Sequence, residues 1–148
     1  MLDKSTVHKV AIEVITKKLE EIQREFDALQ ESLLSETKSS AGDKHETGRA
    51  MTQLAQEKLS KQLVETKKQL DGLRKIDPSE KLDKIGFGSF IQTSRGFFFV
   101  SIGIGQIKVE STPVFCITAG SPIGQKLLQK QAGDTIQMNG EIQIIEIS

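Results

Sequence analysis

The sequence predicts an α+β protein in which a long α-helical hairpin precedes a small β-rich domain. Three features indicate this: apolar residues at heptad spacing in the first half, a short polar turn between two such stretches, and short β-branched and aromatic runs in the second half. A chain of 148 residues allows one or two small domains. We expect a coiled-coil hairpin over residues 1–76 with its turn near 39–47, a linker over 77–84, and an α+β domain over 85–148.

The first arm of the hairpin is predicted from its heptad seam. Residues 1–41 contain no Gly or Pro, and polar side chains fill most positions between the apolar ones. The apolar positions step alternately by three and four residues, as a coiled-coil seam does: Ile12, Ile15, Leu19, Ile22, Phe26, Leu29 and Leu33. An arm of about 30 residues is about 45 Å long, so the hairpin has a base and a distant tip.

The second arm is predicted from a second apolar stripe that follows the turn. Its members are Leu54, Leu59, Leu63, Leu70 and Leu73, and Thr66 completes the heptad steps from Leu59 onward. Residues 77–79, which read Asp-Pro-Ser, end the helix because Pro cannot continue it. The short polar turn favours pairing of the two arms within one chain, so we expect a monomer.

The second half changes to the pattern of a sheet. Short apolar runs at 85–93, 97–102, 106–110 and 114–118, punctuated by Gly96, Gly103 and Gly105, predict four strands. Asn139-Gly140 predicts a tight hairpin between strands at 135–138 and 141–147, the latter with alternating apolar residues.

One short helix is expected inside the second domain. Ser121 is a good N-cap, and Pro122 suits the first helical position. The helix is predicted to end near Gly133 and to turn Ile123, Leu127 and Leu128 inward.

Composition excludes several classes of function. Lys plus Arg equal Asp plus Glu at 20 each, which argues against strong stand-alone nucleic-acid binding driven by phosphate neutralisation. No apolar run approaches the ~20 residues of a membrane span. Cys116 is the only cysteine and lies in an apolar run, so it is interpreted as a buried small hydrophobe and not as a nucleophile. A single cysteine forms no internal disulfide, which fits a reducing cytoplasm.

The hairpin turn holds the main candidate for chemistry, the carboxylates Asp43 and Glu46 at positions i and i+3. One interpretation is a capping box that starts the second helix. The other is a divalent-metal clip, in which two protein carboxylates hold Mg²⁺ and a partner supplies the other ligands. The cations Lys38, Lys44 and Arg49 are candidate contacts to a phosphate backbone or to a protein partner.

Two stretches resemble the Gre-type transcript cleavage factors of bacteria. Residues 41–46, Ala-Gly-Asp-Lys-His-Glu, are similar to the family's tip, where Gly-Asp is followed two residues later by Glu-Asn. Residues 121–128, running on to Gly133-Asp134, are similar to the family's C-terminal helix and the Gly-Asp after it. The order and separation of the two stretches fit the family, and the likeness in architecture covers nearly the whole chain.

The resemblance implies an FKBP-like fold for residues 85–148 and a transcription elongation factor whose partner is RNA polymerase. Ser121, Pro122 and Ile123 match the family segment associated with docking at the rim of the polymerase's secondary channel. The hairpin would enter the channel, where Asp43 and Glu46 would help to hold a shared Mg²⁺ and orient a water. The polymerase itself would hydrolyse the backtracked RNA, so the chain would not be an enzyme and would contact nascent RNA only indirectly.

Three alternatives remain open at this stage. Thr47, Gly48, Arg49 and Ala50 stand where the family usually has Asn, Ala, Glu and Tyr, which favours a non-cleaving regulator of the same channel. An FKBP-like chaperone fits less well, because such pockets use Tyr and Trp and this chain has neither. The heptads also allow a coiled-coil interaction protein.

Overall fold

The computed structural model describes residues 2–37 and 43–148, and the side chains of all of these except 36, 37 and 43–46. Contacts divide the chain into two compact units. One unit, Ile15–Gln69, is the helical hairpin without the start of its first helix and the end of its second. The other combines Met1–Val14 with Leu70–Ser148 and contains the whole sheet. We call them the hairpin unit and the sheet unit.

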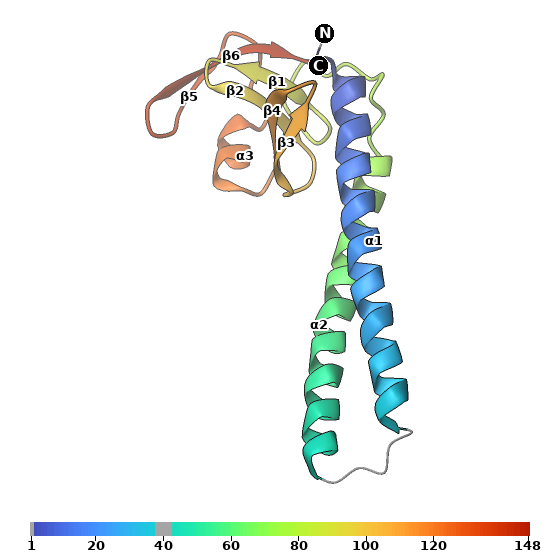
Figure 1. The fold of residues 1–148 in the computed structure, drawn as a ribbon. Helices are drawn as coiled ribbons and strands as arrows, with labels where there is room; N and C mark the ends of the chain where they lie inside the picture. Colours follow the sequence, from blue (N-terminus) through green and yellow to red (C-terminus); the bar gives the residue numbers. More distant parts are fainter. Residues whose placement is uncertain (1, 38–42) are drawn as a thin grey trace. The chain divides into compact units, whose positions relative to one another are not determined.

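The helical hairpin and the α+β fold predicted from the sequence are confirmed. Helix α1 spans Lys4–Thr37 and helix α2 spans Asp43–Arg74, and the two run antiparallel (Figure 1). Asp3 precedes α1 as an N-cap residue, because its Oδ1 accepts a hydrogen bond from the Thr6 backbone N–H at 2.8 Å. None of the described helices is both long and apolar enough to cross a membrane.

The heptad seam of the hairpin is confirmed along α1 and along the later part of α2. Every predicted seam position of α1 is buried or half-buried. In α2, Leu63 and Leu70 are buried, and Thr66 is only 2% exposed. The prediction for Leu54 is wrong, because this side chain is 65% exposed. Leu54 lies five residues before Leu59, out of the heptad step, and the seam continues instead through the half-buried Gln56 and Thr52.

The sheet unit holds six strands in the order β3-β4-β2-β1-β6-β5. Their bounds are β1 Phe90–Thr93, β2 Gly96–Val100, β3 Gly105–Val109, β4 Thr112–Ile117, β5 Thr135–Gln137 and β6 Glu141–Ile147. Only β2 and β4 pair in parallel, and the other neighbours are antiparallel.

Three local predictions for this unit are corrected. Residues 85–89 form no strand, because Gly88 has φ +95° and the backbone turns there. Helix α3 spans only Pro122–Leu127, because the backbone leaves the helical conformation at Leu128 (ψ 134°) and Gln129 follows with φ 66°. The alternation of β6 breaks after Ile144, where the pairing with β1 shifts register and leaves Ile145 49% exposed.

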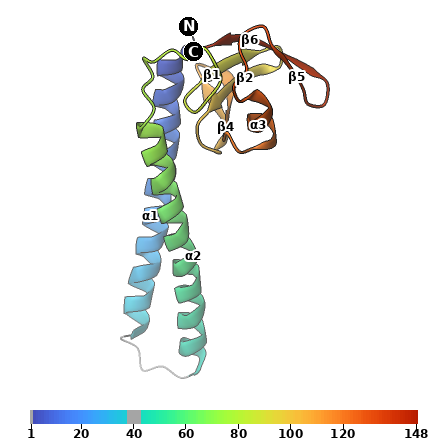
Figure 2. The ribbon, with the colours of Figure 1, turned by 180° about the vertical axis from the view of Figure 1, so that it is seen from behind.

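The two faces of the sheet pack against different layers. Helix α3 lies beside one face of the sheet (Figure 2). This face and α3 share a buried cluster that includes Ile91, Phe98, Leu127 and Ile144. On the opposite face, Phe99 is fully buried and meets the His8 ring of α1 edge-on at 6.4 Å between centroids. His8 Nε2 lies 2.6 Å from the Leu73 carbonyl oxygen, to which it donates a hydrogen bond, so the helix ends are tied together here.

Candidate functional site

The tip acids stand at the start of α2. Helix α2 begins at Asp43, so Asp43 and Glu46 lie in its first turn. Their side chains, and that of Lys44, lie outside the described part of the structure, as does the whole of Lys38. The choice between a capping box and a metal clip therefore stays a prediction.

Arg49 is the one predicted tip contact whose side chain is described, and it is exposed on α2. Close to it, Met51 and Leu54 are 66% and 65% exposed. The apolar stripe predicted a seam position for Leu54 and gave no prediction for Met51. The heptad steps, extended backward from Leu59, fall on positions 56 and 52, so neither Met51 nor Leu54 lies on the seam. The first turns of α2 thus present a cation and two large apolar side chains to solvent.

The predicted docking segment forms the N-terminus of α3. Ser121 caps the helix: its Oγ accepts a hydrogen bond from the Gly124 N–H at 3.1 Å and donates to the Thr118 carbonyl at 2.7 Å. Pro122 is exposed at the first helical position, whereas Ile123 is half-buried against the core cluster. The structural role predicted for Ser121 and Pro122 is confirmed, and Pro122 is the member of the segment that is open to a partner.

Gly124 fixes the position of this helix against the chain before it. A Cβ added at Gly124 would lie 2.1 Å from the Thr118 carbonyl oxygen and 2.9 Å from that of Ala119. Both neighbours are backbone atoms, so neither can swing aside. The close approach holds Ser121 and Pro122 at the end of β4 in one fixed arrangement.

Cys116 is buried, as the sequence predicted. It is 1% exposed in β4, and burial raises the pKa of its thiol to about 12. At neutral pH the sulfur is a protonated thiol that cannot act as a nucleophile.

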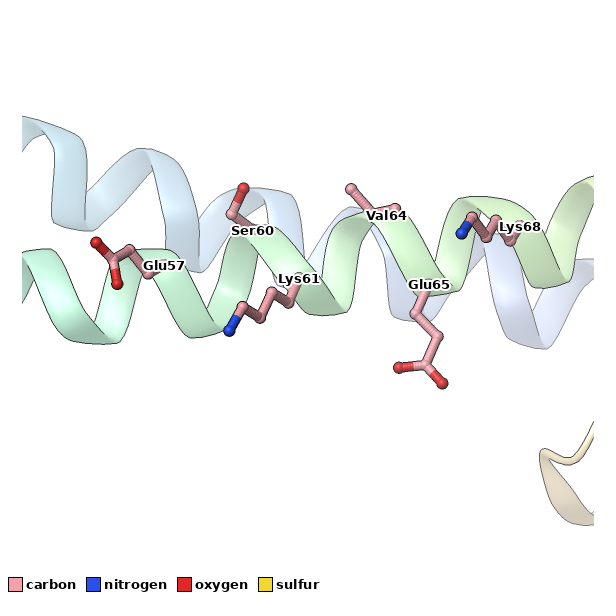
Figure 3. Close-up of a pocket in the computed structure, with 6 residues that line it drawn as sticks. All are labelled: Glu57, Ser60, Lys61, Val64, Glu65 and Lys68. Carbon is pink, nitrogen blue, oxygen red and sulfur yellow. The ribbon is translucent and has the colours of Figure 1, made fainter.

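One hollow of the hairpin unit lies along α2 alone. It measures about 700 Å³, and its lining residues are Glu57, Ser60, Lys61, Val64, Glu65 and Lys68. Figure 3 shows these side chains spread along the helix without converging on one point. Because all six come from one helix, no second element closes the hollow, and it offers no enclosed ligand site.

A cavity of the sheet unit was missed by the sequence analysis. It has a volume of about 640 Å³ and lies between the start of α1, the residues after α2 and the strands β1, β2 and β6. Its most notable side chains are the buried Lys4 and the aromatic pair Phe90 and Phe97. Heptad and strand patterns do not reveal it, since it forms where segments distant in sequence meet.

Comparison with known proteins adds no identification. No protein-family model matches this chain, and a search of curated proteins gave no match. Among the residues whose side chains are described, no cluster of three or more His, Cys, Asp or Glu has the arrangement of a metal site. The tip acids stand outside that set, so the finding does not bear on them.

Proposed function

We propose that this chain is a transcription elongation factor that enters the secondary channel of RNA polymerase and stimulates Mg²⁺-dependent cleavage of backtracked RNA. The observation that carries the proposal is the hairpin itself. Helices of 34 and 32 residues flank the turn, and α2 begins at the first of the two acids. A helix of 34 residues is about 50 Å long, which gives Asp43 and Glu46 the reach to be presented inside a partner.

The coordination chemistry of Mg²⁺ indicates which ligands this chain would supply and which the polymerase and RNA would supply. Mg²⁺ is commonly bound by one or two protein carboxylates and completes its octahedron with water and phosphate oxygens. Asp43 and Glu46 would supply two carboxylates, and the polymerase and RNA would supply the other ligands. A metal held in this way would supply the chemistry that orients a water for attack on the phosphodiester and stabilises the leaving oxygen. It would be shared with the polymerase and would not be held tightly by the factor alone.

Docking would use the FKBP-like second domain at the N-terminus of α3. Pro122 is exposed there, and the Ser121 cap and the close packing of Gly124 hold it rigidly. A rigid exposed apolar residue loses little conformational entropy on binding. The factor is proposed to act in the bacterial cytoplasm as a monomer, with Lys38, Lys44 and Arg49 contacting the polymerase or RNA near the tip.

The test is a cleavage assay on a backtracked elongation complex with 3′-unpaired, labelled RNA and Mg²⁺. The informative variant is Asp43→Asn with Glu46→Gln, because Asn caps a helix as well as Asp does whereas an amide binds Mg²⁺ poorly. The matched control is Glu57→Gln, which removes one exposed carboxylate of the same helix away from the tip. We expect rapid RNA shortening with wild type and Glu57→Gln, and none with the double variant.

Docking is tested in parallel by polymerase affinity. Pro122→Asp places a charge on the exposed surface of α3 while suiting a helix N-terminus, and should weaken binding at least tenfold. Pro113→Asp, at the exposed proline of β4, is the control and should bind as wild type does. Wild type that neither binds nor cleaves would disprove the proposal.

A second function is favoured by the residues after Glu46. Thr47 and Arg49 are exposed on the turn of α2 that follows the acids, where the resembling family usually has Asn and Glu. A cation beside the acids would compete with Mg²⁺ for their charge. If wild type binds the polymerase and shortens no RNA, the chain is a non-cleaving regulator of the secondary channel.

A further inference from the structure

The cavity of the sheet unit opens on the sheet face opposite α3. Gln92 of β1 pairs in register with Phe97 of β2 and with Glu146 of β6, so these three residues share that face. All three line the cavity. The walls come from the first residues of α1 and from Pro78–Lys81. The volume of about 640 Å³ lies within the range of small-molecule sites.

The floor of the cavity is a flat aromatic surface. The rings of Phe90 and Phe97 stack with 5.5 Å between centroids and 12° between planes. Phe90 is only 6% exposed, while Phe97 is half-buried and leaves part of its ring open. A planar aromatic ligand could extend this stack, which is a favourable arrangement for π systems.

One wall of the cavity holds a buried ammonium group. Lys4 is 5% exposed, and its Nζ donates a hydrogen bond to the Glu80 carbonyl oxygen at 2.7 Å. That carbonyl is the only acceptor it reaches within the described part of the chain, although an ammonium has three protons to donate. Burial lowers the pKa of Lys4, and the charges of Glu80 and Asp77 oppose this. The group therefore gains from an anionic partner that enters the cavity.

The acids near Lys4 offset its burial only in part, because the effect of burial on its pKa outweighs the charges of Glu80 and Asp77. The Asp3 carboxylate caps α1, and its bond from Thr6 lowers its pKa. Glu80 and Glu146 are exposed to solvent, as is Lys81. The charge that is least hydrated, and so most responsive to a ligand, is the ammonium of Lys4.

We propose that this cavity binds a planar aromatic carboxylate, with its ring on Phe97 and its carboxylate hydrogen-bonded to Lys4 Nζ. The class follows from the two features that meet there, an open aromatic face and a buried cation with unused donors. A carboxylate suits an ammonium better than a neutral acceptor does, because charge-assisted hydrogen bonds are the stronger ones. The site is independent of the tip acids and of the docking segment.

The test is a titration of the ¹⁵N-labelled full chain, followed by the amide chemical shifts. The probes are 2-naphthoate and its neutral isostere 2-naphthamide. We expect saturable shifts at Gln92 and Phe97 with 2-naphthoate, and at least tenfold weaker binding of the amide. Absence of saturable shifts at these residues up to millimolar naphthoate, or equal affinity for both probes, would overturn the proposal without any variant being needed.

Two variants with matched controls assign the contacts. Lys4→Met keeps the aliphatic stem and should abolish the preference for the carboxylate, whereas Lys108→Met, at an exposed lysine of β3, should leave it unchanged. Phe97→Leu should weaken both probes at least fivefold, whereas Phe115→Leu, at an exposed ring of β4, should weaken neither. A Lys4→Met variant that retains the full preference for naphthoate would contradict the assignment.

Discussion

The hairpin unit and the sheet unit bury very different amounts of their sequence. Among the described residues between Ile15 and Gln69, the buried apolar side chains are Ile15, Ile22, Leu33 and Leu63. The sheet unit buries many more, and several are completely inaccessible, including Phe99, Ile91, Val100, Val109 and Val114. The difference is one of geometry: a pair of helices buries one stripe of each, whereas a sheet between two layers buries both faces.

Because of this difference, packing constrains the residues of the two units to different extents. On α2 the seam becomes polar toward the turn, through Gln56 and Thr52, and Gln56 Nε2 donates to Gln30 Oε1 at 2.5 Å. Because few apolar side chains of α2 are buried there, packing constrains the choice of residues near the tip only weakly. In the sheet unit most positions are constrained by packing. Variants at matched positions of the two units test this contrast.

Phe99→Ala should give the largest loss of stability. The Phe99 side chain is fully buried against His8, so its removal leaves a cavity and should cost about 3–5 kcal/mol. Phe26→Ala, in the half-buried seam of the hairpin unit, should cost only about 1–2 kcal/mol. Urea unfolding measures both, and equal losses would contradict the contrast between the units.

Alkylation of Cys116 should be at least 100-fold slower in the native chain than in urea. A pKa near 12 in place of 9.0 keeps the folded thiol neutral, which reduces the thiolate at pH 8 by about 1,000-fold. A cysteine placed in the hairpin seam, Leu29→Cys in a Cys116→Ala background, should react far faster. Iodoacetamide labelling read by mass spectrometry checks both rates. Comparable rates at the two positions would show that the sheet unit opens as easily as the hairpin.

Gly124→Ala should destabilise the sheet unit by about 2–3 kcal/mol, because the new methyl group would overlap the Thr118 carbonyl. The control is Gly120→Ala, where an added Cβ meets nothing within 4 Å. That change should be within about 0.5 kcal/mol of wild type. Thermal unfolding of the two variants gives the comparison, and a neutral Gly124→Ala would mean that α3 moves freely from β4.

Gln56→Leu should have the smallest effect and the opposite sign. It replaces a half-buried polar seam residue by an apolar one and should stabilise the hairpin by about 0.5–1 kcal/mol, despite the lost bond to Gln30. Lys58→Leu, at an exposed position of α2, is the control and should change little. A destabilised Gln56→Leu would indicate that the amide pair fixes the register of the two helices.

The sequence predicted the elements well where one physical signal dominates. The heptad steps of α1, the cap at Ser121 and the turn at Asn139-Gly140, where both residues have positive φ, were all readable locally. The prediction for Leu54 was wrong because it relied on apolar character alone, although Leu54 lies five residues before Leu59 and breaks the heptad spacing. The early end of α3 depends on the extended ψ of Leu128 and the positive φ of Gln129, which no local signal reveals.

The candidate sites, like the secondary-structure elements, were predictable where their residues are close in the sequence. The acids and the docking segment were found as motifs, since their residues are neighbours in the sequence. The cavity that holds Lys4 was not, because it joins the start of α1 to strands about ninety residues later in the chain. Only the folded arrangement brings a lysine and two phenylalanines together.

The Mg²⁺ dependence of RNA cleavage distinguishes a metal-binding role of Asp43 and Glu46 from a role in the hairpin's structure. If Asp43 and Glu46 hold the shared metal, each single variant, Asp43→Asn or Glu46→Gln, should raise the Mg²⁺ concentration needed for half-maximal cleavage at least tenfold. Polymerase affinity should stay unchanged, and Glu57→Gln should follow the wild-type curve. A reduced maximal rate with an unaltered Mg²⁺ midpoint would contradict the account, because the acids would then act on the hairpin or the polymerase and not on the metal.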